Sequence, residues 1–279
     1  MPNWLHVERG DAPLIVSMPH AGQELLPEME RQVVSAWLAR KDTDWYLERL
    51  YDFAPELGAT IVRTALSRTV IDMNRDPSGQ SLYPGQATTE LCPPTTFDGE
   101  PLYRAGNGPN TAEIARRRRA FFEPYHALLQ AEIARLRAQH SKIVLFEAHS
   151  IRSVIPRLFE GVLPDFNIGT NSGESCDTAL TATVEAICDA TGFSRVSNGR
   201  FKGGWTTRHY GKPDDGVHAI QLELACRCYM HEPNEEHWAS NTQYSRDNWP
   251  PPYDEEHAAP IREALYRILR ACIRFASTP

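Results

Sequence analysis

Short apolar runs alternate with amphipathic stretches along most of the chain, a pattern typical of α/β proteins. Runs rich in Leu, Ile, Val and Phe predict buried strands at 14–18, 59–64, 69–73, 142–148, 193–197 and 217–226. Apolar residues at helical spacing predict helices at about 28–40, 43–57, 111–139, 175–191 and 254–275. Because strands and helices alternate with short connections, we expect one domain over residues 1–279, with a parallel or mixed sheet covered by helices.

Two segments break this alternation. Residues 78–110 are rich in Gly and Pro and show no periodicity, and a loop of that length is usually functional. Residues 202–211 carry Gly203, Gly204 and Gly211, which suit a loop that comes close to another part of the backbone. These glycines form neither a G-x-G-x-x-G nor a P-loop pattern, so nucleotide binding has no support.

The composition disfavours several classes of partner. With 29 Lys and Arg against 36 Asp and Glu residues, the net charge is −7, which disfavours a general affinity for nucleic acid or an anionic membrane. No apolar run approaches the roughly 20 residues that span a bilayer, and residues 1–10 lack the apolar stretch of a secretory signal. Six cysteines without a C-x-x-C pair predict reduced thiols, so we expect a cytoplasmic protein.

Polar residues stand where several of the predicted strands end. His20 follows the first strand, residues 74–76 (Asn-Arg-Asp) follow the third, and His149 follows the fourth. Glu223 interrupts an otherwise apolar strand, where an unpaired carboxylate costs several kcal/mol. Since the ligands of open α/β sheets bind at the carboxyl ends of strands, these residues are candidates for a functional site.

Two histidines and an aspartate suit an open zinc site with three protein ligands and a position left for water. His20 and His149 are separated by 129 positions, and no H-E-x-x-H motif links them. A structural interpretation therefore stays open beside the metal site, in which both histidines cap strand ends through hydrogen bonds.

Arginine side chains are the candidates for binding an anion. Arg75 and Arg208 can each donate paired hydrogen bonds to a carboxylate, and both lie in segments that we place near the predicted site. For Arg75 the alternative is a structural ion pair with Asp72 or Asp76. Residues 116–119, all Arg, spread around a predicted helix, so we interpret them as a solvated face rather than a nucleic-acid patch.

A series of short motifs, taken in order, resembles the N-formylglutamate amidohydrolase family. They are Ser17-Met18-Pro19-His20-Ala21-Gly22, Asp42-Thr43-Asp44-Trp45, Ile71-Asp72-Met73-Asn74-Arg75-Asp76, Glu147-Ala148-His149-Ser150, Thr207-Arg208-His209-Tyr210-Gly211 and Gln221-Leu222-Glu223. The resemblance runs from about residue 12 to residue 232 and leaves out the C-terminal helix. It implies a three-layer α/β/α fold around a central mixed, largely parallel sheet, of the phosphorylase/hydrolase-like, zinc exopeptidase-like kind. It also implies metal-dependent hydrolysis of a linear amide, N-formyl-L-glutamate, to formate and L-glutamate in histidine degradation.

The same resemblance implies a metal site. We expect one Zn²⁺ ion per chain on His20 and His149, with Asp44 as the third ligand and Glu24 as the competitor for that place. Imidazole and carboxylate ligands also suit Co²⁺, Mn²⁺ or Fe²⁺, so the sequence does not fix the ion.

Roles for the other site residues follow from the resemblance as well. Glu223 is expected to act as general base and then as general acid, and Arg75 or His209 to stabilise the oxyanion. The residues expected to bind a small dianionic substrate are Arg75, Arg208, Asn74 and Tyr210.

Two other functions stay open at this point. Another N-acyl-amino-acid deacylase or a carboxypeptidase-like hydrolase would keep the fold and change the group that is cleaved. A metal-free binding module for acidic amino acids would keep the fold and lack stoichiometric zinc. No pattern in the sequence predicts an oligomeric state, or whether residues 78–110 move as a lid.

Overall fold

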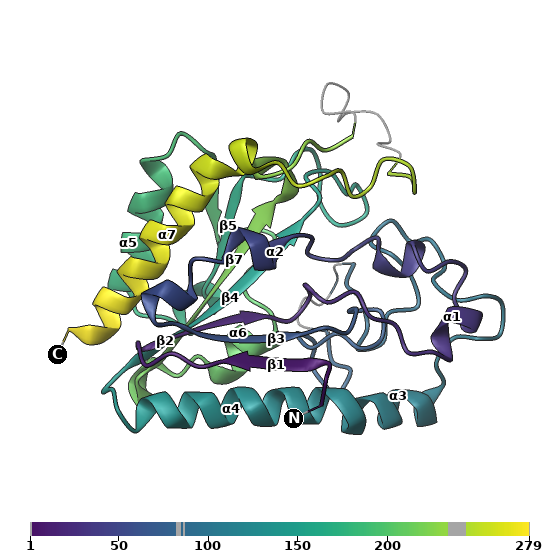
Figure 1. Cartoon of the computed structure of the whole chain (residues 1–279), viewed down its shortest axis with the longest axis horizontal. Helices are drawn as coiled ribbons and strands as arrows, with labels where there is room; N and C mark the ends of the chain where they lie inside the picture. The colour runs from purple at the N-terminus through teal and green to yellow at the C-terminus, as the bar shows by residue number, and fades with distance from the viewer. Residues whose placement is uncertain (1, 82–84, 86, 234–243, 279) are drawn as a thin grey trace.

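The structure, a computed structural model, describes residues 2–81, 85, 87–233 and 244–278. Its centre is a seven-stranded sheet in the order β1-β3-β2-β4-β7-β5-β6 (Figure 1). The strands are β1 (Leu5–Glu8), β2 (Leu14–Met18), β3 (Thr60–Thr64), β4 (Ile143–Ile151), β5 (Phe166–Gly169), β6 (Arg195–Ser197) and β7 (Val217–Ala225). Only β1 with β3 and β5 with β7 pair antiparallel, while the other neighbours run parallel. The predicted mixed, largely parallel sheet is confirmed.

Helices cover both faces of this sheet and give the predicted three layers (Figure 1). One face is covered by α2 (Leu47–Leu50), α5 (Thr178–Asp189) and α7 (Glu255–Ser277). The other is covered by α3 (Thr111–Arg117), a π-helical turn (Arg118–Phe122), α4 (Glu123–Arg137) and α6 (Trp205–Tyr210). Among the described residues the shorter elements are α1 (Met29–Gln32) and single 3-10 turns at Leu38–Arg40, Pro55–Leu57, Asn171–Gly173, Pro213–Asp215 and Cys226–Cys228.

The alternation of side chains along β4 and β7 positions the polar residues. Apolar residues of both strands, such as Phe146 and Leu222, pack against the α5 and α7 layer. Successive side chains of a strand point to opposite faces, so Glu147, His149 and Glu223 point toward the α4 and α6 layer instead. In the register of the two strands His149 lies directly beside Glu223, which brings two groups far apart in sequence together.

The structure corrects three of the predicted elements. The helix expected at 28–40 ends at Gln32, because Val33 turns into extended backbone and pairs with Tyr103. The helix expected at 43–57 shrinks to α2, because Tyr46 adopts a left-handed conformation with a φ of 62° directly before it. The run 69–73 forms no strand. Its β-branched residues reflect burial rather than sheet pairing.

Further differences concern the sheet edges and the long helix. Strands β1 and β5 were not predicted, because each has only four residues. The long helix begins as predicted at Thr111, although Asn110 caps it by accepting a hydrogen bond from the Glu113 amide. The solvated face predicted for residues 116–119 is wrong for Arg117, which is buried and donates to Glu113, the Val70 carbonyl and the Tyr103 hydroxyl.

Two remaining expectations can be compared directly with the structure. The predicted loop at 78–110 contains no helix or strand among its described residues, with residues 82–84 and 86 lying outside them. All six cysteines are free and buried, in line with the predicted reduced thiols. Within the described parts of the chain, no helix is long and apolar enough to cross a membrane.

Candidate metal centre and active site

Three separate segments bring His20, Asp44 and His149 together. His20 follows β2 after Pro19, Asp44 lies in the loop after the 3-10 turn at Leu38–Arg40, and His149 lies within β4 rather than after it. The Asp44 amide donates to the His20 carbonyl, and the amide of Ser150 approaches the Asp44 carboxylate at 3.3 Å. All three side chains are buried. The backbone therefore fixes the acid between the two imidazoles.

The geometry of this cluster fits one metal ion. Asp44 Oδ2 lies 3.0 Å from His149 Nδ1 and 3.7 Å from His20 Nδ1, and one ligand atom from each residue lies within 4.8 Å of the others. Ligands around a tetrahedral zinc ion stand about 3.3 Å apart, because each bond is about 2.0 Å long. His20 Nδ1 is buried and has no hydrogen-bond partner among the residues that the structure describes. A cation would satisfy that atom, so the residues present fit the ion.

A second atom of each histidine meets a buried carboxylate. His20 Nε2 lies 2.7 Å from Asp72 Oδ1, and His149 Nε2 lies 3.3 Å from Glu147 Oε2. Metal-binding histidines characteristically donate their other ring nitrogen to such a group, which orients the ring. Both imidazoles therefore point Nδ1 toward Asp44 and Nε2 toward an acid.

The two histidines differ in their proton affinity without a metal. Burial, together with the positive charge of Arg68, lowers the pKa of His20 to about 4. Burial also opposes the charged form of His149, but its hydrogen bonds to Asp44 and Glu147 outweigh it and raise the pKa to about 10. His20 is thus neutral at pH 7 and ready to donate a lone pair, whereas His149 must give up a proton to a binding ion.

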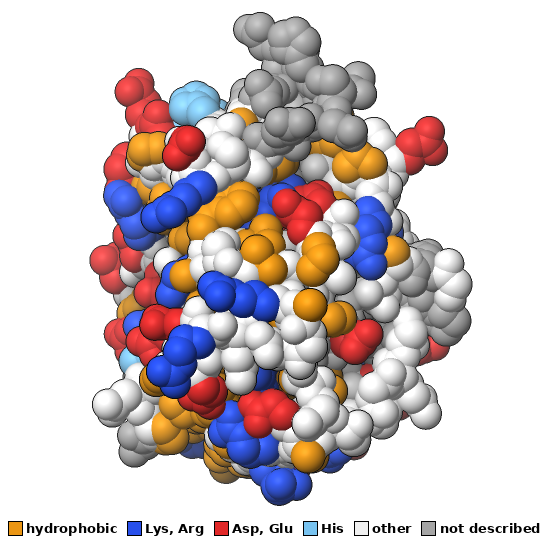
Figure 2. Space-filling view, turned by 90° about the vertical axis from the view of Figure 1, so that its right-hand side faces the viewer, with side chains coloured by type: hydrophobic (Ala, Val, Ile, Leu, Met, Phe, Trp, Pro, Cys, Tyr) orange, Lys and Arg blue, Asp and Glu red, His pale blue; other side chains and the backbone are white. Residues whose placement is uncertain are grey.

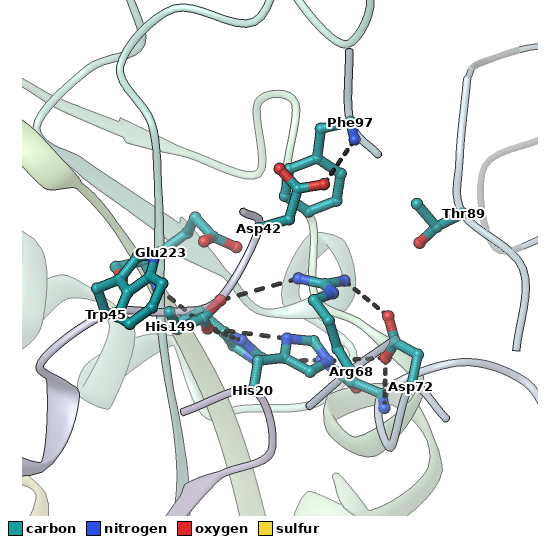
Figure 3. Close-up of polar contacts among 12 residues, drawn as sticks. His20, Asp42, Trp45, Arg68, Asp72, Thr89, Phe97, His149 and Glu223 are labelled. Atoms are coloured by element: carbon teal, nitrogen blue, oxygen red, sulfur yellow. Dashed lines mark hydrogen bonds and ion pairs between the residues drawn. The ribbon is translucent and has the colours of Figure 1, made fainter. Parts of the chain in front are cut away.

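Arg68 links the acids around the cluster. Its guanidinium donates to Asp72 Oδ2 at 2.6 Å and lies 3.8 Å from Asp44 Oδ1 (Figure 3). Burial alone would raise the pKa of Asp72, but the positive charges of Arg75 and Arg68, together with the hydrogen bond from His20, hold it well below its usual range. Asp72 therefore stays ionised and keeps accepting from His20.

Glu223 lies at the edge of the same cluster. It is 8 % exposed and sits next to His149 in the sheet (Figure 3). Burial raises its pKa to about 7, against the opposing effect of the His149 charge. A carboxyl group with a pKa near neutrality can both accept and release a proton at pH 7, which is the property of a general base.

A cavity opens beside these residues and is lined by three arginines. Arg68, Arg75 and Arg200 contribute to its wall, together with His20, Asn74, His149, Gln221, Glu223 and apolar side chains such as Phe97 and Phe201. Arg75 donates to the Thr89 hydroxyl at 2.9 Å, and Arg200 donates to the Ala87 carbonyl at 2.7 Å. Segment 87–89 of the long loop thus contacts both of these guanidinium groups.

The positive charge of this cavity is local. Figure 2 views the side of the molecule that carries α1, and there the described Lys and Arg side chains are interspersed with Asp and Glu side chains. They form no continuous positive surface on that face. The three arginines of the cavity can therefore attract an anion although the chain has a net charge of −7.

The structure does not bring every predicted site residue to this cavity. Arg208, His209 and Tyr210 are absent from the described residues that line it, because the glycine loop turns into α6 before them. Arg208 donates to the Gly203 carbonyl, His209 stacks on the Trp205 ring, and Tyr210 contacts His126. Their predicted contacts with substrate are not supported by these positions.

The structure also places the two residues for which the sequence left alternatives open. Glu24 is exposed and lies outside the His20, Asp44 and His149 cluster. Both alternatives for Arg75, anion binding and an ion pair, fit its position: it lines the cavity and its Nε atom also lies 3.7 Å from the Asp72 carboxylate.

Sequence reasoning missed Arg68 and Arg200. Arg68 pairs with Asp72 four residues later, but that spacing brings side chains together on a helix, and the segment was predicted as a strand, so no signal marked it. Arg200 follows a short strand and precedes the glycine loop, with no pattern that marks it. It reaches the cavity by donating to the Leu158 and Ala87 carbonyls.

Comparison with known proteins points in one direction. The model of the N-formylglutamate amidohydrolase family matches residues 12–230. An N-formylglutamate deformylase of Pseudomonas aeruginosa is 51% identical over 233 residues, which are 83% of this chain and 87% of that protein. An N-formylglutamate deformylase of Pseudomonas putida is 44% identical over 278 residues, which are 99% of this chain and 98% of that protein.

The fold has a match among solved structures. The crystal structure of an N-formylglutamate amidohydrolase from Ralstonia eutropha JMP134 superposes with a TM-score of 0.74 and 22% identity. The superposition covers 99% of this chain and 98% of that one. At this level of identity the likeness establishes a shared fold.

Proposed function

The chain belongs to the N-formylglutamate amidohydrolase family, and we propose that it hydrolyses N-formyl-L-glutamate to formate and L-glutamate with one divalent metal ion. It is an amidohydrolase, and its relatives carry the name of the deformylase that acts on this compound. The reaction belongs to histidine degradation. We place it in the cytoplasm, where the six free cysteines would stay reduced.

One observation carries the proposal. A cluster of two imidazoles and a carboxylate lies beside Glu223 at the wall of a cavity with three arginines, and within the described part of the chain Nδ1 of His20 has no hydrogen-bond partner. His20, Asp44 and His149 would hold the ion, for which Zn²⁺ is the best candidate. When bound, it supplies Lewis acidity, which polarises an amide carbonyl and lowers the pKa of water from 15.7 toward about 7.

Glu223 would move the proton of the reaction. It accepts one proton from the attacking water and delivers it to the glutamate nitrogen as the C–N bond breaks. Water thus adds its oxygen to the formyl carbon, and formate and the free amine leave. The raised pKa of Glu223, about 7, suits both halves of this transfer.

The arginines would bind the two carboxylates of the substrate. Arg75 and Arg200 both contact segment 87–89 and line the cavity with guanidinium groups, which bind carboxylates well. Asn74 lines the same cavity and can add an amide donor. Arg200 takes the place that the sequence had suggested for Arg208. Arg68, the cavity arginine nearest Asp44, would stabilise the oxyanion that forms on the formyl oxygen, in place of His209.

Formate release from purified protein tests the proposal. The protein is freed of metal with a chelator, reloaded with one equivalent of Zn²⁺, and supplied with N-formyl-, N-acetyl- or N-succinyl-L-glutamate. We expect turnover to need the metal and to favour the formyl compound. Preference for a larger acyl group would favour another N-acyl-amino-acid deacylase, and the absence of both turnover and stoichiometric zinc would favour a binding module.

A further inference from the structure

The two histidines of the cluster are supported in the same way, and the proposed reaction assigns no step to either supporting acid. Asp72 forms a hydrogen bond with His20 Nε2 and accepts another from Arg68. Glu147 backs His149, and nothing in the proposed reaction requires it. A role for Glu147 must therefore come from its contact with the imidazole.

Glu147 occupies an unfavourable place for a carboxylate. It is fully buried, and Oε1 has no hydrogen-bond partner among the described residues. Its neighbour in β2, Ser17, pairs its hydroxyl with Tyr125 instead. Burying a carboxylate with an unsatisfied oxygen costs several kcal/mol. The hydrogen bond between this carboxylate and His149 Nε2 offsets part of that cost.

Asn74 competes with Glu147 for the same ring nitrogen. The Asn74 Oδ1 atom accepts from the Thr206 amide at 2.9 Å, which turns the side-chain nitrogen toward His149 Nε2 at 3.0 Å. An amide nitrogen can only donate a hydrogen bond, and a carboxylate can only accept one. Nε2 therefore bonds to Glu147 when it carries a proton and to Asn74 when it does not.

The choice between these two partners decides whether His149 can bind a metal. In the neutral ring only one nitrogen carries a proton. If Asn74 donates to Nε2, the proton sits on Nδ1, which then donates to Asp44 and has no lone pair for an ion. If Nε2 donates to Glu147, Nδ1 presents its lone pair beside Asp44 and His20.

We propose that Glu147 is a positioning residue that selects the metal-binding tautomer of His149. The inference rests on the proposed function, in that it takes the His20, Asp44 and His149 cluster to hold a divalent ion. Glu147 acts through the imidazole and touches neither the substrate nor the reacting atoms. Its negative charge favours a proton on Nε2 and so overrides the donor of Asn74.

Zinc affinity of Glu147→Gln tests this proposal directly. The amide keeps the shape of the side chain but can donate as well as accept, so it no longer selects a tautomer. Competition with a chromophoric chelator measures the Kd for Zn²⁺, and we expect it to rise about 10- to 100-fold. Asp72→Asn should weaken zinc binding similarly, because Asp72 supports His20 in the same way.

A matched control separates positioning from stability. Glu132 is a buried carboxylate in α4 that pairs with Arg9 and Arg135. We expect Glu132→Gln to lower the resistance to urea without changing the Kd for zinc. We expect Glu147→Gln to raise the Kd for zinc whether or not its metal-free resistance to urea falls, because Glu147 also pairs with His149 in the metal-free protein.

The outcomes are distinct. A Kd of Glu147→Gln within about twofold of a zinc-binding wild type would overturn this inference and leave the proposed function standing. A wild type that binds no zinc would overturn the metal site and this inference with it. If the variant does not fold, ¹⁵N-histidine NMR of zinc-loaded wild type decides: we expect a downfield-shifted proton on Nε2 of His149, and a proton on Nδ1 would refute the proposal.

Discussion

Glu223 shows how the environment of a single residue sets its chemistry. Burial in β7 raises its pKa to about 7, while its neighbour in β4, His149, belongs to the proposed metal site. The same carboxylate on the surface would be fully ionised and a weak base at pH 7. Its position in the sheet therefore matters as much as its identity.

The change Glu223→Gln tests that role. We expect kcat for N-formyl-L-glutamate to fall by about 10²- to 10⁴-fold, because the amide cannot carry the proton. Zinc content should stay at one equivalent, since Glu223 is not one of the three proposed ligands. Measurement of formate release alongside metal analysis checks both points. A kcat within a few-fold of wild type, with zinc bound, would remove Glu223 from the proton transfer.

His126 supplies a prediction about pH and stability. Its Nε2 donates to the Met73 carbonyl and its Nδ1 lies 3.1 Å from the Tyr210 hydroxyl, in a buried position that disfavours the charged ring. Burial lowers its pKa to about 3, against 6.5 for the unfolded chain. Between these values the unfolded state binds a proton and the folded state does not, so stability is complete above pH 6.5 and declines as pH falls toward 3.

Comparison with His126→Gln isolates this effect. Between pH 7 and pH 4.5 the wild type should lose about 3 kcal/mol more unfolding free energy than the variant, at about 1.4 kcal/mol for each pH unit below 6.5. Urea unfolding at both pH values, with a chelator present to exclude metal release, measures the difference. Parallel losses in the two proteins would show that His126 does not titrate in this way.

The site residues that could be predicted from sequence are those with a local signal. His20 and His149 stand at or near strand ends, and Glu223 contradicts its apolar surroundings. Arg200 carries no comparable signal, because it reaches the cavity through carbonyls of two segments remote in sequence. Long flexible side chains are placed by tertiary contacts, and those are not visible in a one-dimensional pattern.

Among the elements, α6 depends most closely on its glycine start. A Cβ atom on Gly204 would lie 2.3 Å from Asn74 Nδ2, which is too close for two non-bonded atoms. Gly204 therefore lets α6 begin directly against the Asn74 side chain, which in turn accepts from the Thr206 amide. The close approach predicted for the glycines of residues 202–211 is confirmed at Gly204, although the segment continues as a helix rather than as a loop.

Gly204→Ala tests this arrangement. We expect the methyl group to displace Asn74, to lower kcat/KM at least tenfold and to cost about 1 to 3 kcal/mol of stability through overpacking. Gly108→Ala is the matched control, because a Cβ there meets nothing within 4 Å. Steady-state kinetics and thermal unfolding of both variants provide the comparison. Equal kinetics for the two would mean that Asn74 needs no such fit.

Element prediction succeeded where periodicity extends over many residues. The strands at β2, β4 and β7 and the long helices were found because burial and spacing agree over at least five residues. It failed at 28–40, 43–57 and 69–73, where short turns are held by tertiary contacts, although the strand predicted between them at 59–64 is confirmed as β3. There the Ser67 and Thr69 hydroxyls both donate to the Ala39 carbonyl, so β-branched residues serve packing without joining a sheet.

At the scale of the whole molecule, the order of strands could not be predicted. The mixed sheet places β4 beside β7, and those strands are separated by β5 and β6 in sequence. Only that crossing brings His149 beside Glu223. The class of fold follows from local patterns, whereas the active site follows from topology.

The distribution of charge over the molecule makes a prediction about substrate choice. A chain with a net charge of −7 should bind a dianion only through local cations such as Arg200. We expect Arg200→Met to raise KM for N-formyl-L-glutamate about 10- to 100-fold, from the loss of a charged hydrogen bond. N-formyl-L-glutamine should be less affected. Arg104→Met is the control, because this exposed arginine of the loop 78–110 lies outside the cavity lining among the described residues, and we expect it to leave KM for both substrates unchanged.

The central claim is that three remote parts of the fold hold one divalent ion next to Glu223. Anomalous diffraction at the zinc edge from crystals of zinc-loaded protein tests it most directly. We expect one peak about 2.0 to 2.2 Å from Nδ1 of His20, Nδ1 of His149 and a carboxylate oxygen of Asp44. A fully loaded crystal with its peak elsewhere, or with Nε2 atoms as ligands, would contradict the account.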